Sequence, residues 1–148
     1  MLAFTSVRKT PQLILPSLDS IAEHWKPCYP WYKKFVNIVL ETPGPLPDLI
    51  VASKGKDVIG CYTLDLKPIE GMPSLWIPTL YIAPAFRRNH YSPVIIQHAK
   101  KMGKELGFDK MYLVSEHTNL YEKFGFELFG PDLCALGDPT QMFVGKTA

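Results

Sequence analysis

Residues 115–126, which read SEHTNLYEKFGF, bring three proton-transferring side chains into one short stretch. Glu116 carries a carboxylate, His117 an imidazole and Tyr121 a phenol, and each of these groups can donate or accept a proton. The stretch follows a predicted strand at 111–115, and ligands of open α/β sheets bind at the carboxyl ends of strands. The pattern favours acid–base chemistry here. A histidine at a strand end can also be a structural hydrogen-bonder, and a tyrosine can close a helix against the sheet, so these interpretations stay open.

A second candidate site is the loop at 84–92, which joins a predicted strand to a predicted helix. The first N–H groups of a helix have no partner within it, and the helix dipole adds about half a positive charge there. Arg87 and Arg88 stand immediately upstream, and guanidinium groups pair with phosphate oxygens at two points. The loop is therefore suited to a pyrophosphate. Taken alone, it is equally compatible with a solvated charged turn.

The helix after this loop has clear start and stop signals. Ser92 is expected as its N-cap, Pro93 as its first residue, and Gly107 lies just past its end. Its apolar residues recur at helical spacing, with lysines on the opposite side. The sequence therefore predicts a helix over 93–106 that packs one face onto a sheet.

The apolar run at 75–83 predicts a central strand, and Pro78 within it indicates a bulge. With the helix and the strand at 111–115 it forms a right-handed parallel crossover. Before it we expect a strand at 3–9, a helix that runs through Leu18 to Trp25 with Ser17 as its N-cap and Pro27 as its end, and a second helix that begins near Pro30. Strands at 49–53 and 58–66 should then form a hairpin. After the crossover we expect a short helix at 119–124, with Asn119 and Glu122 as capping box and Gly125 as its stop, and two closing strands within 126–146. This order, βααβββαβαββ, predicts an α/β domain on a mixed sheet.

Length and composition favour one ordinary globular domain spanning residues 1–148. A net charge of +2 gives no electrostatic argument for nucleic acid or membrane as partners. The three cysteines, Cys28, Cys61 and Cys134, lack metal-ligand spacing and are expected to be reduced thiols, so no metal is expected. No apolar run approaches about 20 residues, and the N-terminus lacks the order of a signal peptide. A cytoplasmic protein is therefore expected.

Three segments together resemble the GNAT superfamily of acyl-CoA-dependent N-acetyltransferases. Arg87 to Ser92 matches, in position, the family's Arg/Gln-x-x-Gly-x-Gly/Ala cofactor signature between a strand and a long helix. The preceding LYIAP at 80–84 is similar to the lead-in to that signature, and LYEKFGF at 120–126 is very similar to the family's second signature. The resemblance covers residues 58–130, about half of the chain.

This resemblance implies a mixed, mostly antiparallel central sheet with helices on both faces and one parallel strand pair that splays. It implies acetyl-CoA as co-substrate, a small primary amine as acceptor, and direct attack of the amine on the thioester in a ternary complex. Main-chain groups of Leu80 and Ile82 would pair with the pantetheine arm, and Tyr121 would lie beside the thioester sulfur. The loop residues that would hold the pyrophosphate are Arg87, Arg88, Asn89, His90, Tyr91 and Ser92. A homodimer is common among such proteins.

The sequence offers several candidates for the general base that takes a proton from the amine. Glu116 and His117 lie nearest the presumed thioester, Asp65 and Glu70 are weaker candidates, and water can also carry the proton. For the acceptor, the aromatic faces of Trp25, Tyr29, Trp31 and Tyr32 could hold a cationic amine, although packing of the N-terminal helices explains them equally simply.

His90 departs from the family pattern, because it stands where the first signature glycine is expected. A side chain there costs on the order of 1 kcal/mol if the backbone has positive φ, and it crowds a phosphate unless the imidazole binds it. Ser92 replaces the second glycine and is small. The departure favours a second hypothesis, a GNAT-fold sensor of acyl-CoA or interaction module without catalysis. A nucleotide-binding module of another α/β fold is a third, weakened by the lack of a GxGxxG or phosphate-loop lysine motif.

Overall fold

The computed structural model describes all residues except 1, 70, 88–89, 116–120, 134–138 and 148. In chain order its elements are β1 (Ala3–Ser6), η1 (Pro11–Leu13), α1 (Ile14–His24), η2 (Lys26–Cys28), α2 (Tyr29–Glu41), β2 (Asp48–Lys54), β3 (Asp57–Leu66), β4 (Leu75–Ile77), β5 (Leu80–Ile82), η3 (Pro84–Phe86), α3 (Tyr91–Glu105), β6 (Lys110–Ser115), η4 (Tyr121–Phe124), β7 (Phe126–Leu133) and β8 (Pro139–Lys146). No helix in these described ranges is long and apolar enough to cross a membrane.

The strands form one eight-stranded sheet in the order β1-β2-β3-β4-β6-β8-β7, with β5 paired to β3 beside this path. Every pairing is antiparallel except that of β4 with β6, in which Trp76 lies opposite Tyr112 and Ile77 opposite Leu113. The expected mixed, mostly antiparallel sheet with one parallel pair is confirmed. Helix α3 connects the two parallel strands, as the crossover prediction required.

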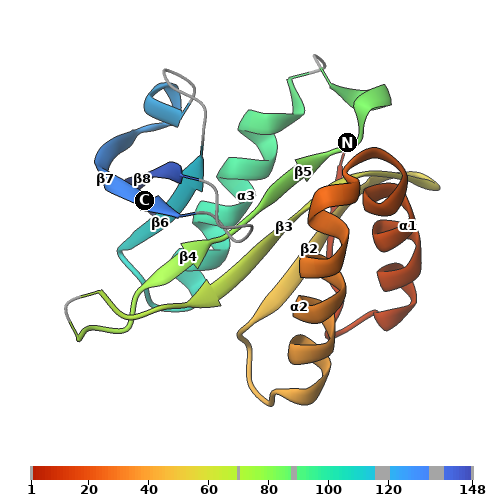
Figure 1. Cartoon of the computed structure of the whole chain (residues 1–148), viewed down its shortest axis with the longest axis horizontal. Helices are drawn as coiled ribbons and strands as arrows, with labels where there is room; N and C mark the ends of the chain where they lie inside the picture. The colour runs from red at the N-terminus through yellow and green to blue at the C-terminus, as the bar shows by residue number, and fades with distance from the viewer. Residues whose placement is uncertain (1, 70, 88–89, 116–120, 134–138, 148) are drawn as a thin grey trace.

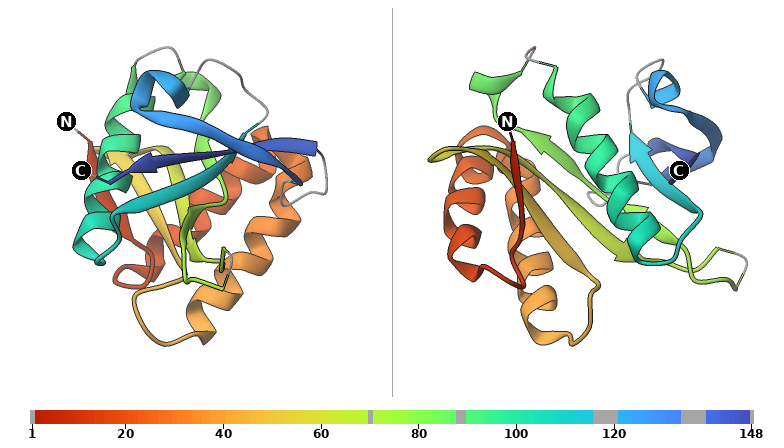
Figure 2. Two further views of the ribbon diagram at one scale, coloured as in Figure 1. Left: turned by 90° about the vertical axis from the view of Figure 1, so that its left-hand side faces the viewer. Right: turned by 180° about the vertical axis from the view of Figure 1, so that it is seen from behind.

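Helices cover both faces of the sheet, with α1 and α2 on one side and α3 on the other (Figure 1, Figure 2). Alternate residues of β2 show that this sheet is buried on both faces. Ile50 and Ala52 belong to the core on the α3 side, whereas Leu49 and Val51 belong to the core on the α1–α2 side. Successive side chains of a strand point to opposite faces, and each large apolar side chain that is fully buried contributes about 1.5–3 kcal/mol.

The apolar run at 75–83 is two short strands and not the single strand that was expected. Between Asp65 and Tyr62 the chain of β3 advances three residues, whereas their partners Trp76 and Leu80 are four apart. One extra residue is therefore inserted next to Pro78, whose ring removes a backbone donor from the ladder. The predicted bulge is confirmed, and it divides the run into β4 and β5.

Two predicted helix starts are wrong. Ser17 is not an N-cap but lies inside α1, where its hydroxyl donates to the Leu13 carbonyl at 2.8 Å. Ser92 is not an N-cap either, because α3 already begins at Tyr91 and His90 occupies the cap position. Pro30 does lie in the first turn of α2, as expected.

Helix ends follow the sequence signals more closely. Gly107 and Gly125 have φ of +93° and +87° directly after α3 and η4, the backbone conformation that stops a helix at glycine. The second of these helices is a single 3₁₀ turn, Tyr121–Phe124. Asn119, the expected cap of that helix, lies outside the described residues.

Candidate functional site

The outer edge of β5 presents main-chain groups that face away from the sheet. The Thr79 carbonyl accepts a hydrogen bond from β3 at 3.1 Å, and the Ala83 amide donates one to β3 at 2.9 Å. Tyr81 lies between them, directly opposite a β3 residue. Because main-chain groups alternate in direction along a strand, those of Leu80 and Ile82 point to the other side.

No strand in the described part of the chain covers that outer edge. The parallel pairing stops at Ile77 in β4, and β5 is paired only with β3. The two strands that lie side by side at β4 and β6 therefore diverge beyond the bulge. An unpaired edge of this kind can bind an extended ligand with the hydrogen bonds that a further strand would make.

Two threonines hold the bulge in place. The hydroxyls of Thr63 and Thr79 lie 2.9 Å apart, and the Thr79 amide donates to the Thr63 hydroxyl at 3.0 Å. Thr63 is completely buried, so these bonds are shielded from competing water. Sequence analysis missed this pair, for which the proline at 78 was the single local signal.

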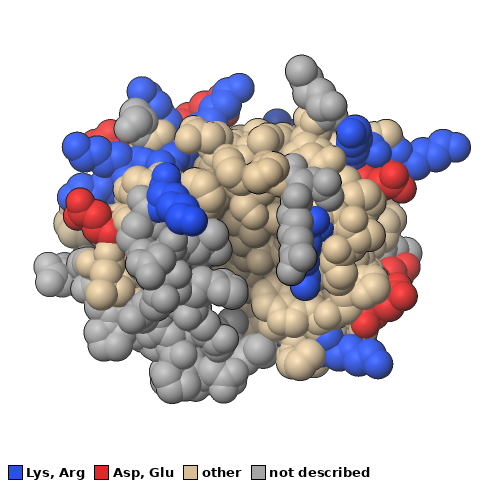
Figure 3. All heavy atoms as spheres, turned by 90° about the horizontal axis from the view of Figure 1, so that it is seen from above, with Lys and Arg blue, Asp and Glu red and all other residues tan. Residues whose placement is uncertain are grey.

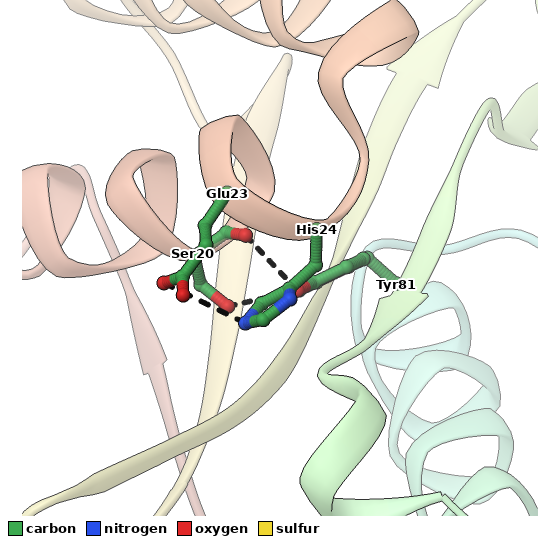
Figure 4. A network of polar contacts seen from close by, with 4 residues as sticks. All are labelled: Ser20, Glu23, His24 and Tyr81. Atoms are coloured by element: carbon green, nitrogen blue, oxygen red, sulfur yellow. Dashed lines mark hydrogen bonds and ion pairs between the residues drawn. The ribbon is translucent and has the colours of Figure 1, made fainter.

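A second set of hydrogen bonds joins β5 to helix α1, which covers one face of the sheet (Figure 4). The Tyr81 hydroxyl lies 2.8 Å from the Ser20 hydroxyl and donates to the Ser20 carbonyl at 3.2 Å. Ser20 belongs to α1, where His24 and Glu23 form an ion-pair contact of 3.6 Å in the next turn. The Trp25 ring stacks on Tyr81 with centroids 5.8 Å apart. These contacts anchor the strand to α1 and leave its outer edge in a defined position.

The chain reaches α3 through a left-handed turn at His90. This residue has φ of +59° and ψ of +30°, and it is the one residue other than glycine with positive φ in the described part of the chain. Such a conformation costs a residue with a Cβ roughly 1–2 kcal/mol. The N-cap of α3 is therefore His90, two residues before the serine that capping preference favoured, and the His90 side chain makes no cap hydrogen bond.

Arg87 connects this loop to the open edge of β5. Its Nε donates to the Ile82 carbonyl at 3.0 Å, so the guanidinium lies at the end of that edge. The neighbouring Arg88 and Asn89 lie outside the described residues. Tyr91 and Ser92 form the first turn of α3, where amide N–H groups lack partners within the helix.

Figure 3 shows the distribution of charge on the face of the molecule where α3 begins. The middle of this face is hollowed, and the described residues that line the hollow are uncharged; Lys and Arg side chains stand on both sides of it, with Asp and Glu side chains among them. An elongated ligand with an apolar arm and anionic groups suits the combination of an open strand edge, a helix N-terminus and the Arg87 guanidinium.

The sequence matches the model of the Acetyltransferase (GNAT) family over residues 18–126, most of the chain. The chain belongs to this family. Among curated proteins no sequence match is found. Similar solved structures include a putative GNAT-family acetyltransferase from Desulfovibrio desulfuricans, 15% identical over 100% of both chains with a TM-score of 0.78.

Two further structures extend this GNAT comparison. An aminoglycoside 6′-acetyltransferase type Ii is 17% identical, with 100% of this chain and 97% of that chain covered and a TM-score of 0.76. The NatC complex bound to Gag peptide and CoA is 16% identical over 98% of both chains, with a TM-score of 0.68. At such identities the likeness shows the shared fold.

The segment with the proposed catalytic groups of this GNAT chain is tied to α3. Tyr121 is the first residue of η4, and at the end of that turn the Phe124 carbonyl accepts a hydrogen bond of 2.5 Å from Lys100 of α3. His117 and Glu116 lie outside the described residues. Their role, and that of the Tyr121 phenol, stays a prediction.

Of the two weaker base candidates, the structure describes Asp65 alone. Asp65 lies on β3, half-buried, and its Oδ1 accepts a hydrogen bond from the Leu66 amide at 2.8 Å. Burial raises the pKa of this carboxyl above its ordinary value, against the effect of that hydrogen bond. Glu70 lies outside the described residues.

The aromatic residues of the N-terminal helices pack into the core on the α1–α2 side. Tyr32 is completely buried, and Trp31 meets its ring edge-on and stacks on Phe35. Trp25 and Tyr29 are partly buried against the same cluster. Packing therefore accounts for Tyr32 fully, and its ring cannot receive an amine from solvent.

Proposed function

We propose that this protein transfers the acetyl group of acetyl-CoA to a small primary amine, by direct attack within a ternary complex. The observation that carries the proposal is the open edge of β5, where main-chain groups of Leu80 and Ile82 face outward beside the first turn of α3. Membership of the GNAT acetyltransferase family supports the chemistry.

The donor would lie along this edge and end at the helix. Main-chain groups of Leu80 and Ile82 would pair with the pantetheine amides, as a neighbouring strand would, and the Ile82 carbonyl would then be shared with or released by Arg87 Nε. The pyrophosphate would lie at the loop formed by Arg87, Arg88, Asn89, His90, Tyr91 and Ser92. The Arg87 Nε already donates to Ile82, so a phosphate would be met by the terminal nitrogens of its guanidinium.

The reaction needs alignment of two substrates and management of two protons. The neutral amine nitrogen attacks the thioester carbon, a C–N bond forms, and the C–S bond breaks with the electron pair leaving on sulfur. The Tyr121 phenol would give its proton to the departing thiolate. His117 or Glu116, or water, would take the proton that the amine loses.

The choice of a small amine as acceptor rests on one comparison. The aminoglycoside 6′-acetyltransferase, whose name states a small-molecule acceptor, aligns with nearly the whole length of both chains. The NatC complex aligns over a similar length and holds a peptide. Peptide N-termini are therefore the competing acceptor class.

One observation favours a second candidate function, an acyl-CoA sensor or interaction module without catalysis. His90 has the positive φ that favours glycine, and it stands exposed at the N-cap of α3, so its side chain would lie close to a phosphate bound at that helix start. Such a protein would bind acetyl-CoA weakly or not at all and would turn none of it over.

The test is a calorimetric titration with acetyl-CoA, followed by thiol release measured with a panel of small primary amines and of short peptides. Release that depends on a small amine supports the proposal. Release with peptides alone assigns the competing acceptor class, and saturable binding without release by any amine assigns the sensor. Absence of binding at millimolar acetyl-CoA would remove the acetyltransferase and the acyl-CoA sensor, and would leave an interaction module.

A further inference from the structure

A pocket of about 390 Å³ lies at the amino end of β6. It is separate from the open edge of β5. Its charged lining residues are Lys100, Lys110, Lys146 and Glu127, and Gly125 and Gly145 also line it. Lys110 begins β6, whereas the predicted acyl site lies beyond the other end of that strand. Along α3, Lys100 is nine residues from Tyr91, which at 1.5 Å per residue is about 14 Å from the first turn.

Two of the lysines form a like-charge pair. Lys110 of β6 and Lys146 of β8 are direct partners in the antiparallel ladder, and both side chains are exposed. Directly opposed residues have Cβ atoms about 5 Å apart, and like charges in such positions destabilise a sheet. An anion bound between them would remove this repulsion.

The third lysine is held at the pocket by contacts from two sides. The Lys100 ammonium donates to the Phe124 carbonyl at 2.5 Å and lies 5.1 Å from the centre of the Phe126 ring. The absence of a side chain at Gly125 keeps the space in front of it open, since a Cβ there would lie 3.4 Å from Lys100 Nζ. An ammonium has three N–H donors, and this carbonyl takes one.

The single carboxylate of the pocket does not neutralise these charges. Within the described ranges the one ion pair joins Glu23 and His24, so Glu127 is paired with none of the three lysines. Three ammonium groups against one carboxylate leave the pocket with an excess of two positive charges. Lysine ammonium groups bind phosphate as point charges, and a phosphate-monoester dianion carries the two negative charges that would balance this excess.

From this geometry we propose that the pocket is a second anion site, which binds the phosphate-monoester dianion of a small molecule other than the acetyl donor. The site is independent of acyl transfer, so it stands or falls separately from the proposed function. The same chemistry could come from the 3′-phosphate of CoA, and the test separates the two sources.

The test uses the full chain and follows backbone amide NMR signals during titration with inorganic phosphate, at constant ionic strength set with chloride. We expect saturable shifts at Gly125 and Gly145 with a midpoint of about 1 mM. The Lys110→Gln/Lys146→Gln variant should weaken this binding at least about tenfold. Lys54→Gln/Lys56→Gln, which removes the same charge from the exposed hairpin, should leave it unchanged.

A second measurement does not depend on signal assignment. Without phosphate, Lys146→Gln should raise Tm because the like-charge pair is gone, and saturating phosphate should raise Tm of the wild type more than that of the variant. Equal phosphate responses in both double variants would overturn the proposal. So would shifts of Gly125 and Gly145 by CoA that 3′-dephospho-CoA fails to produce, because the phosphate would then be the donor's own.

Discussion

The hydroxyl of Tyr62 on β3 lies 2.7 Å from Nδ1 of His98 on α3. Phe4 of β1 stacks on the same imidazole, with ring centroids 3.8 Å apart. Tyr62 is completely buried and His98 half-buried, so this contact joins three elements inside the core on the α3 side. Where the phenol donates, Nδ1 of His98 accepts and the imidazole is neutral; which of the two groups donates depends on the histidine tautomer.

His98 should make stability depend on pH. Burial, and secondarily Lys101, lowers the pKa of His98 below its ordinary value of 6.5, against the opposite effect of Glu105. The unfolded chain therefore binds the proton more readily, and this contribution to stability is present above pH 6.5 and lost as pH falls toward the folded-state pKa. The slope for one proton cannot exceed about 1.4 kcal/mol per pH unit.

Urea unfolding of the wild type and of His98→Gln between pH 7.5 and 5 measures this contribution. The difference between the two proteins should shrink as the pH falls. His24→Gln, which removes an exposed histidine of α1, is the matched control and should preserve the wild-type pH profile. A wild-type profile in His98→Gln would contradict the assignment.

Tyr32 differs from Tyr62 in the hydrogen bonding of its hydroxyl. Tyr32 of α2 is completely buried, and its hydroxyl makes no hydrogen bond of normal geometry among the described residues, although the Thr79 side chain is near enough to interact with it weakly. A buried donor without a partner costs about 1–3 kcal/mol of desolvation. Tyr32→Phe should therefore raise the free energy of unfolding by about 1 kcal/mol, whereas Tyr62→Phe, which removes the bond to His98, should lower it by a similar amount. Destabilisation of equal size in both variants would disprove this contrast.

Local signals predicted most of the architecture. Pro78 indicated the bulge, Gly107 and Gly125 ended their helices, and the short interval between helix and strand predicted the parallel crossover. These features depend on backbone conformations that few residue types can adopt, so single residues reveal them.

Contacts between residues that are distant in the chain could not be predicted from the sequence. Thr63 meets Thr79, and Tyr62 meets His98, across intervening strands and loops, and no local pattern marks such pairs. The predicted start of α3 was wrong because it, too, depends on more than local sequence. Capping preference favours Ser92, but the path of the loop into the helix imposes the left-handed turn on His90.

Gly60 of β3 should be essential for the position of β5. A Cβ on Gly60 would collide with the Tyr81 carbonyl oxygen and lie 3.0 Å from Ile82 Cα, and both are backbone atoms that cannot turn aside. Gly60→Ala should cost at least about 1–3 kcal/mol of stability. Because the strand must move, we also expect weaker acetyl-CoA binding by calorimetry at a temperature where the variant is folded. Binding and stability equal to wild type would show that β5 is not constrained by this contact.

Tyr121→Phe tests the proposed proton donor. The variant keeps the ring and removes the hydroxyl, so kcat should fall about 10- to 1000-fold while acetyl-CoA affinity stays nearly constant. Steady-state thiol release together with calorimetry separates the two quantities. Unchanged kcat, with the chemical step shown to be rate-limiting, would remove Tyr121 from the mechanism.

The last prediction concerns His90, whose backbone has the conformation of a glycine without the freedom of one. His90→Gly should raise the free energy of unfolding by up to about 1 kcal/mol, because relief of the left-handed strain exceeds the added entropy of the unfolded chain. Thermal unfolding measures this effect without any ligand. His90→Ala is the control, since it removes the imidazole but keeps the Cβ and therefore the strain.

Acetyl-CoA binding to the same two variants decides between the two functions proposed for the site. If the imidazole crowds the phosphate, both variants bind more tightly than the wild type; if the imidazole binds the phosphate, both bind more weakly. Tightening in His90→Gly alone would assign the effect to the backbone. We expect tightening in both variants, with wild-type dissociation constants in the micromolar to sub-millimolar range, roughly 5–8 kcal/mol of binding free energy. No detectable binding by the wild type at millimolar concentration, with binding restored in His90→Gly, would contradict the acetyltransferase and leave the non-catalytic module.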